Sequence, residues 1–296
     1  MGYQLWTSPI TGYRRKGTRL EELRSLLGSG ITAHAILEPL QSCPAEAPSM
    51  EICDLLKQRD FDVAGVQSQR DGPVIGFVAR VSLKNGFIRD YLQPITADLL
   101  ISDFTPLPTL LTVLKERQHV FVLIGPEVRG IVTRADLNKP PVRVYLFGII
   151  SLLEMHLGFW ARAVYGEDSW QCRLNLKRIE AAKKIQCERR RRNQEMNLFE
   201  CLQFCDKRDL IIARDDLREK LHLGTKSQAR ALLKRAEDLR NVLPHSQKDL
   251  VHRSSWPETI NLVEWVEAVV HTSDEQLEQE AKISAERGED GLWQSV

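Results

Sequence analysis

The stretch Gly130-Ile131-Val132-Thr133-Arg134-Ala135-Asp136-Leu137 decides the fold of the first half of the chain, because an earlier stretch repeats its pattern. Gly76 aligns with Gly130 at an offset of 54 residues. Three upstream pairs agree at an offset of 58 residues: Pro48 with Pro106, Leu56 with Leu114, and Arg59 with Arg117. The difference in offset falls in a polar stretch that ends Asp71-Gly72-Pro73, a turn that absorbs a change of length easily. The sequence therefore contains an internal repeat.

Each copy of the repeat has the same order of expected elements. The first copy has a helix and two strands (Ser49–Gln58, Phe61–Val66, Val74–Ala79), and so does the second (Leu107–Arg117, Val120–Ile124, Arg129–Thr133). The strands are short and nearly continuous in Val, Ile and Phe, which favours burial on both faces. A helix with a polar start should close each copy. We therefore predict a mixed α/β pair of βαββα units, with repeat 1 at residues 31–95 and repeat 2 at residues 96–141.

The stretch that begins at Gly130 resembles the closing signature of a CBS domain, in which a glycine, two apolar residues and a threonine precede Asp-Leu. In that family two units pack into a disc with two clefts. The resemblance implies that Asp136 hydrogen-bonds the ribose of an adenine nucleotide (AMP, ADP or ATP), that Thr133 contacts a phosphate, and that Arg134 is a further phosphate ligand. A carboxylate can accept from both ribose hydroxyls, and a threonine hydroxyl can donate to a phosphate. In the alternative interpretation, Thr133 and Asp136 only cap the following helix.

The first copy departs from that signature. Ala79 stands where the threonine should be, and Ser82 stands where the aspartate should be. Neither side chain can chelate a ribose diol. We therefore expect one competent nucleotide cleft rather than two.

From Val142 onward the pattern becomes helical. Helices are expected at Val142–Ala163, Leu174–Gln194, Asn197–Cys205, Asp215–Leu221, Lys226–Leu243 and Pro257–His271. Gly224 and Pro244 separate them, as helix stop signals do. We predict an all-α helical bundle at residues 142–272, an acidic and partly helical tail at 273–296, and a basic N-terminal arm with a short helix at 1–30, capped by Thr18.

The segment Arg240-Asn241-Val242-Leu243-Pro244-His245 resembles the Arg-polar-x-x-x-His motif of HEPN domains, which are helical bundles that include many metal-independent endoribonucleases. The resemblance implies that Arg240 holds the scissile phosphate, that His245 moves the proton of the RNA 2′-hydroxyl, and that Glu154 positions the arginine. Residues five apart on a helix point about 140° apart, so Pro244 has to end the helix for His245 to approach Arg240. The alternative is a surface salt bridge of Arg240 with Glu237 or Asp238, and a loop histidine.

Nine Lys or Arg residues stand against two Glu residues between positions 173 and 192, and four of the nine are Arg189–Arg192. This helix could bind RNA phosphates. It could equally be a solvated helix end, where cations suit the helix dipole.

The overall composition is that of an ordinary soluble protein, with 43% hydrophobic residues, 27% charged residues and a net charge of +1. No run of about 18 apolar residues and no secretory signal is visible, so we expect a cytoplasmic protein with no membrane segment. The six cysteines include no C-x-x-C pair and are expected to be reduced core thiols. The histidines show no ligand spacing, so no metal is expected.

Together these features predict a cytoplasmic, homodimeric regulatory protein whose CBS pair senses a nucleotide and controls a helical effector domain. The most specific form of this hypothesis is that the effector domain is a metal-independent endoribonuclease. The alternative is a regulatory scaffold without catalysis, whose helical domain mediates dimerisation and partner docking. No P-loop or G-x-S-x-G motif supports another class of enzyme.

Overall fold

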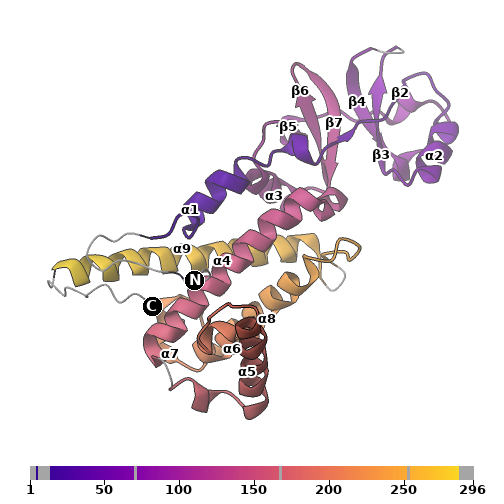
Figure 1. Ribbon diagram of the computed structural model, residues 1–296. Helices are drawn as coiled ribbons and strands as arrows, with labels where there is room; N and C mark the ends of the chain where they lie inside the picture. The colour runs from indigo at the N-terminus through magenta and orange to yellow at the C-terminus, as the bar shows by residue number, and fades with distance from the viewer. Residues whose placement is uncertain (1–4, 6–13, 70–71, 167–168, 252–253, 287–296) are drawn as a thin grey trace. The chain divides into compact units, whose positions relative to one another are not determined.

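The computed structural model describes residue 5 and residues 14–69, 72–166, 169–251 and 254–286. The chain divides into two compact units, one formed by residues 28–142 and the other by residues 1–27 together with 143–296. We call residues 28–142 the tandem module, and the described residues of the other part the helical unit (Figure 1).

The tandem module contains two copies of one strand–helix–strand–strand arrangement. The first copy consists of β2 (Ser42–Pro44), α2 (Ser49–Gln58), β3 (Val63–Gln67) and β4 (Val74–Ala79). The second consists of β5 (Leu100–Ser102), α3 (Leu107–Glu116), β6 (His119–Ile124) and β7 (Glu127–Thr133). In each copy the first strand runs parallel to the second, and the second pairs antiparallel with the third (Figure 1). The predicted repeat is therefore confirmed for these four elements.

The two copies agree in register as well as in order. Gly76 pairs with Val66 in the first copy, and Gly130 pairs with Val122 in the second. The register shifts directly after Val66 and directly after Val122. A one-residue slip would turn every buried side chain to the other face of the strand, so the shared shift marks equivalent positions. The alignment of Gly76 with Gly130 is confirmed, but part of the change in offset lies before β3, because Val66 matches Val122 at an offset of 56 residues.

The segment that precedes each copy pairs with a strand of the other copy. The short strand β1 (Glu38–Pro39), before the first copy, pairs antiparallel with β7 of the second. Gln93, before the second copy, exchanges both backbone hydrogen bonds with Phe77 of β4, at 2.8 and 2.9 Å. A Cβ on Gly76 would lie 2.5 Å from the Gln93 carbonyl oxygen, so this pairing requires glycine. These reciprocal pairings join the copies into one module.

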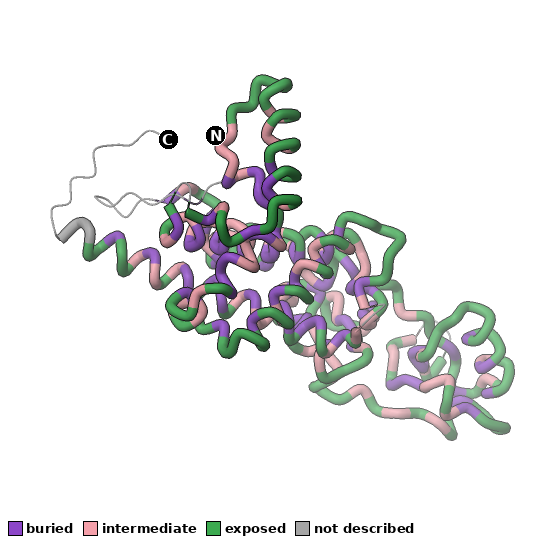
Figure 2. The backbone as a smooth tube through the Cα atoms, turned by 90° about the horizontal axis from the view of Figure 1, so that it is seen from below, coloured by how far each residue is buried: buried purple, intermediate pink, exposed green. Residues whose placement is uncertain are grey.

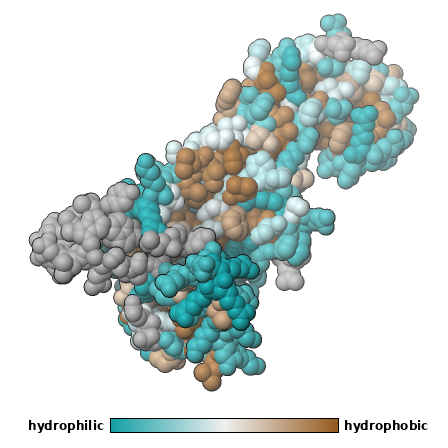
Figure 3. Space-filling view, in the orientation of Figure 1, coloured by the Kyte–Doolittle hydropathy of each residue, from teal (hydrophilic) through white to brown (hydrophobic). Residues whose placement is uncertain are grey.

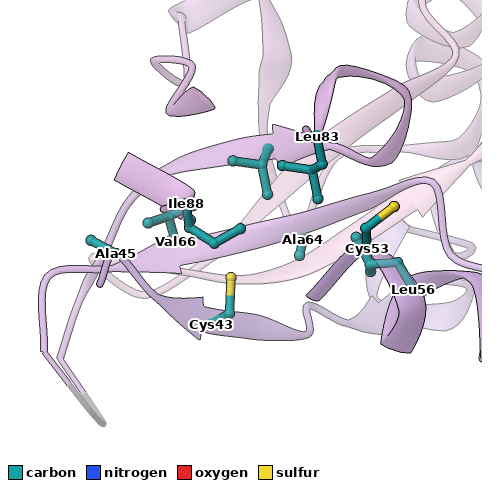
Figure 4. Close-up of a cluster of buried hydrophobic side chains, with 9 residues drawn as sticks. Cys43, Ala45, Cys53, Leu56, Ala64, Val66, Leu83 and Ile88 are labelled. Carbon is teal, nitrogen blue, oxygen red and sulfur yellow. The ribbon is translucent and has the colours of Figure 1, made fainter. Parts of the chain in front are cut away.

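Each copy has an apolar core, and aromatic rings lie between the copies. In the first copy, β2, α2, β3 and β4 bury a cluster that includes Cys43, Cys53 and Leu56 (Figure 4). Burial raises the pKa of the Cys43 thiol to about 11, which keeps it protonated. The rings of Phe77 and Phe121 lie 5.0 Å apart, and His119 contacts both.

The closing helix that we expected in each copy is only a short 3₁₀ turn. The turn η3 (Arg80–Ser82) follows β4, and η6 (Arg134–Asn138) follows β7. The first turn cannot extend because Asn85-Gly86 follows, and Gly86 has a φ of +131°. Further 3₁₀ turns lie at Ala33–Ala35, Ile88–Tyr91 and Ala97–Leu99.

The helical unit contains α1 (Leu20–Leu23), which continues into a π turn at Arg24–Gly28, and longer helices, all of which were expected except α6. These are α4 (Pro140–Tyr165, in this unit from Arg143 on), α5 (Leu176–Arg191), α6 (Phe204–Ile212), α7 (Asp215–Lys220), α8 (Lys226–Val242) and α9 (Trp256–Glu286). Buried positions recur along α9, which leads to the grey C-terminal trace (Figure 2).

Several boundaries in the helical unit differ from the prediction. The expected helix at Asn197–Cys205 is a 3₁₀ turn at Phe199–Cys201, followed by α6, because Asp206 accepts from the Gln203 backbone N–H at 3.0 Å and starts a new helix. The expected tail is helical through Glu286, because Leu277 and Ala281 continue the buried stripe of α9. At the N-terminus, Glu22 accepts from the Arg19 backbone N–H at 3.2 Å, so Arg19 precedes the helix instead of Thr18.

The expectation that the chain has no membrane segment stays a prediction, and α4 is the helix that bears on it. By length and composition this helix could cross a bilayer, because its average hydropathy tolerates Glu154 and His156. In the structure, 56% of its apolar window is buried inside the protein, as in the core helix of a folded domain.

Candidate functional site

Thr133, the last residue of β7, is hydrogen-bonded to Asp136. Asp136 Oδ2 accepts hydrogen bonds from the Thr133 backbone N–H at 2.7 Å and from Thr133 Oγ1 at 2.8 Å. Asp136 is buried, with 7% of its surface exposed. The pair therefore makes the capping interaction that we considered as the alternative to nucleotide binding. It also holds the carboxylate in one fixed position.

Lys139 completes this arrangement and was not predicted. Its Nζ lies 2.9 Å from Asp136 Oδ1 and 2.5 Å from Glu38 Oε1, and it donates to the Ile36 carbonyl at 2.5 Å. Burial opposes the charged ammonium, but the hydrogen bonds to Glu38 and Asp136 outweigh it and raise the pKa of Lys139. We call Thr133, Asp136, Lys139 and Glu38 the Asp136 site. The i,i+3 spacing of Asp136 and Lys139 was visible in the sequence, but only the β1–β7 pairing brings in Glu38.

Arg134 points elsewhere. Its Nε donates to the Leu114 carbonyl at 2.8 Å, and its Nη2 donates to the Lys115 carbonyl at 2.7 Å. Both acceptors lie in the last turn of α3, where carbonyls have no partner within the helix. A phosphate contact by Arg134 would require these bonds to break, so the structure does not bring Arg134 to the Asp136 site.

The equivalent position in the first copy has no such site. Ala79 precedes η3 with no side-chain cap, and Val81 is 87% exposed. Arg80 pairs with Asp62 at 2.7 Å on the outside of the turn. The backbone is equivalent nonetheless, since the Arg80 N–H donates to the Asp62 carbonyl as the Arg134 N–H donates to that of Gln118. The two copies thus share a turn and differ in its chemistry.

In the helical unit, the structure brings Glu154 and Arg240 together. Glu154 Oε2, on α4, lies 3.4 Å from Arg240 Nη2, in the last turn of α8. Glu154 Oε1 pairs with Lys207 at 2.9 Å, so two cations share this carboxylate. The alternative partners of Arg240 are engaged elsewhere: Glu237 pairs with Arg208, and Asp238 pairs with Lys234.

His245 lies outside that ion pair. The helix α8 ends at Val242, as Pro244 predicts, and His245 follows in an exposed loop. Its backbone carbonyl accepts from Arg143 Nη1 at 3.1 Å, and the same nitrogen reaches the Leu243 carbonyl at 3.3 Å. Arg143 is buried and holds this loop, a role that the sequence did not indicate. Within the described chain, no hydrogen bond joins the His245 imidazole to Arg240.

A second polar cluster is buried in the helical unit. His156 Nδ1 and Trp160 Nε1 each lie 2.6 Å from Ser273 Oγ, and Arg14 forms an ion pair with Asp274. Burial lowers the pKa of His156 to about 4, so its imidazole is neutral near pH 7. Ser273 is fully buried, which assigns the cluster to packing of α9 against α4. Among the described residues, no group of His, Cys, Asp or Glu is arranged to hold a metal ion.

No family model and no curated protein matches the chain. Among solved structures, it is similar to the CBS domain of a bacterial CNNM/CorC family Mg²⁺ transporter in complex with ATP, at 16% identity and a TM-score of 0.33, over 41% of this chain and 95% of that one. It is also similar to CBSX2 of Arabidopsis thaliana in complex with AMP, at 17% identity and a TM-score of 0.32, over 40% of this chain and 97% of that one. An uncharacterised conserved protein from Pyrococcus horikoshii gives 18% identity and a TM-score of 0.33, over 37% of this chain and 90% of that one. Such values describe a general likeness to CBS pairs over part of the chain. The remainder of the chain is largely helical.

Proposed function

We propose that the tandem module binds an adenine nucleotide at the Asp136 site, and that the bound nucleotide regulates the helical unit of a cytoplasmic protein. The observation that carries this proposal is the asymmetry between two copies with the same backbone. Only the second copy has a hydroxyl and a carboxylate on its closing turn, and they are held 2.8 Å apart. A purely structural turn does not need them, because η3 forms without them.

The residues of the Asp136 site suit a ribose phosphate. Each Asp136 oxygen has more than one lone pair, so the carboxylate can accept ribose hydroxyls while it keeps Thr133 and Lys139. The Lys139 ammonium is charged and partly exposed, and can serve a phosphate as a point charge. Pro140, the next residue, begins α4, so a ligand at this site would act directly on the start of the helix that carries Glu154.

The test is titration calorimetry of the full chain with AMP, ADP and ATP, together with thermal unfolding. A nucleotide at 100 times its Kd should stabilise the folded state by about 2.7 kcal/mol. Asp136→Asn keeps the size of the side chain and should abolish binding. Ser82→Ala, at the equivalent position of the first copy, is the matched control and should bind as wild type does. No heat and no stabilisation with any adenine nucleotide at millimolar concentration would refute the proposal.

A second function, metal-independent RNA cleavage by the helical unit, is supported by the Glu154–Arg240 ion pair. In this reaction His245 accepts the proton of an RNA 2′-hydroxyl, whose oxygen attacks the adjacent phosphorus. The bond to the 5′-oxygen breaks, that oxygen takes up a proton, and a 2′,3′-cyclic phosphate remains. Arg240 stabilises the charge on the phosphate. Because His245 does not reach Arg240 within one chain, we propose that two copies pool their motifs.

A homodimer is consistent with the exposed apolar side chains Leu26, Val144 and Phe147 of the helical unit, which are 69%, 54% and 41% exposed. Figure 3 shows hydrophobic surface gathered where α1 and the first half of α4 lie.

The test of cleavage is incubation of RNA with the protein in EDTA. His245→Ala should lower the rate by roughly 10²–10⁴-fold, the usual contribution of acid–base catalysis. His222→Ala, a loop histidine outside the motif, should leave it unchanged. Equal activity in wild type and His245→Ala would exclude the ribonuclease and leave a regulatory scaffold.

A further inference from the structure

In the helical unit outside α5, ten cations that the structure describes are paired with a carboxylate. The pairs include Arg14–Asp274, Arg24–Glu267, Lys207–Glu154, Arg208–Glu237, Arg214–Asp216, Arg218–Asp215, Lys220–Glu280 and Lys234–Asp238. Several of these partners are far apart in sequence, so the pairing reflects the tertiary fold. Ion pairs across the fold therefore neutralise part of the positive charge of this unit.

Within the described chain, α5 has the densest group of cations without a carboxylate partner. It carries eight basic and two acidic residues over positions 176–192. Arg178 pairs with Asp206 and Asp209, and Arg189 donates to the side-chain oxygen of Gln194. The other six side chains are exposed, and none of them pairs with a carboxylate in the described chain: Lys177, Lys183, Lys184, Arg190, Arg191 and Arg192.

Three of these cations, Lys177, Lys184 and Arg191, share the outward side of α5. Ile179 and Ala182 are buried on the inward side, and Asn175 caps the helix by accepting from the Arg178 N–H at 3.0 Å. Lys177, Lys184 and Arg191 are seven residues apart, so they form one stripe with steps of about 10.5 Å along the axis. In Figure 3 the part of the helical unit where α5 lies is predominantly hydrophilic.

Helix termini explain only part of this charge. Arg189–Arg191 lie in the last turn, where cations favour the negative end of the helix dipole. Lys177, however, lies in the first turn, where the dipole disfavours a cation, and Lys183 and Lys184 lie in the middle. The helix dipole therefore accounts for the cations of the last turn, but not for those of the first turn and the middle of α5.

We infer that the outward face of α5 binds the phosphate backbone of a nucleic acid. A row of unpaired cations on a rigid helix matches a regular polyanion, which gains affinity by releasing its counterions. An acidic membrane is disfavoured, because a helix that lies in a bilayer interface presents apolar side chains to it. In α5 the apolar side packs inward, and the exposed Leu176 stands alone at the N-terminal end. This inference does not depend on nucleotide binding at Asp136 or on RNA cleavage.

The test is fluorescence anisotropy of the full chain with a labelled single-stranded RNA, and with DNA of the same sequence. The variant Lys177→Gln/Lys184→Gln/Arg191→Gln removes the stripe. Its matched control, Arg214→Gln/Lys220→Gln/Lys234→Gln, removes two half-buried cations and one exposed cation that have carboxylate partners, for the same change in net charge. Circular dichroism verifies that both variants are folded.

The stripe variant should weaken binding at least about tenfold at about 50 mM salt and reduce the slope of log K against log salt by about 2, since each phosphate contact on a single strand contributes about 0.7. The control variant should stay within about twofold of wild type at the same salt. Equal losses in both variants would assign binding to net charge and overturn the inference, as would no binding by wild type. Preferential binding to phosphatidylserine vesicles would also overturn it. Tighter binding to RNA than to DNA, or the reverse, would identify the nucleic acid.

Discussion

The two copies of the tandem module share a backbone and differ in chemistry. Their helices have the same length, their strands pair in the same register with the same shift, and the turns that follow Ala79 and Thr133 begin with equivalent hydrogen bonds. Only the second copy has a buried carboxylate there, held by a threonine and a lysine. The fold thus depends on the apolar strands and on Gly76 and Gly130, where the preceding segments pair with β4 and β7. The side chains of the closing turn can differ without changing this fold.

The largest effect should come from the core position that the copies share most closely. Leu56 and Leu114 occupy equivalent places in α2 and α3 and are 4% and 0% exposed. Each change to Ala should destabilise its copy by about 2–5 kcal/mol, because it leaves a cavity. We expect similar losses in urea unfolding followed by circular dichroism. A loss confined to one copy would show that the two cores are not equivalent.

Gly76 and Gly130 should differ in how well they tolerate substitution by alanine. A Cβ on Gly76 would meet the Gln93 carbonyl at 2.5 Å, whereas one on Gly130 would meet the side chains of Leu37 and Val122 at 3.2 Å. Gly76→Ala should cost about 1–3 kcal/mol, because backbone must move. Gly130→Ala should cost less, because Leu37 can shift. A lower urea midpoint for Gly130→Ala than for Gly76→Ala would contradict the close approach of the Gln93 carbonyl to Gly76.

The closing turns should differ in what they contribute to stability without ligand. Asp136→Ala removes the acceptor of the Thr133 N–H and a counter-charge of Lys139, which should cost about 1–3 kcal/mol. Ser82→Ala at the equivalent, half-buried place should change stability by less than about 0.5 kcal/mol. Thermal unfolding of both variants gives the comparison. Equal melting temperatures would mean that the Asp136 pair does not stabilise the turn.

The smallest expected effect concerns the aromatic contact between the copies. His119 stands where the first copy has Val63, and burial lowers its pKa, although Asp62 opposes this. The unfolded chain therefore binds the proton more readily, and His119 contributes a loss of stability as the pH falls from about 7 to about 5. His119→Val should make the urea midpoint fall less over that interval. An unchanged fall would assign the acid sensitivity to other groups, such as His156.

The sequence by itself determined the repeat, the helices of both halves and the asymmetry of the closing turns. These features are local: Val and Ile runs form strands, Pro244 ends a helix, and a threonine three residues before an aspartate forms a cap. The proximity of Glu154 and Arg240 was also expected, although from a resemblance rather than from the pattern of residues.

Only the tertiary structure decided which side chains meet across the fold. Glu38 reaches the Asp136 site because β1 pairs with β7, and Arg134 donates to two carbonyls at the end of α3. The helix α9 continues past His271 because Leu277 and Ala281 are buried, and only the structure shows which cations of α5 have a carboxylate partner. Such contacts join residues that are distant in the chain, and no periodicity or spacing records which distant groups will lie within a few ångströms of each other.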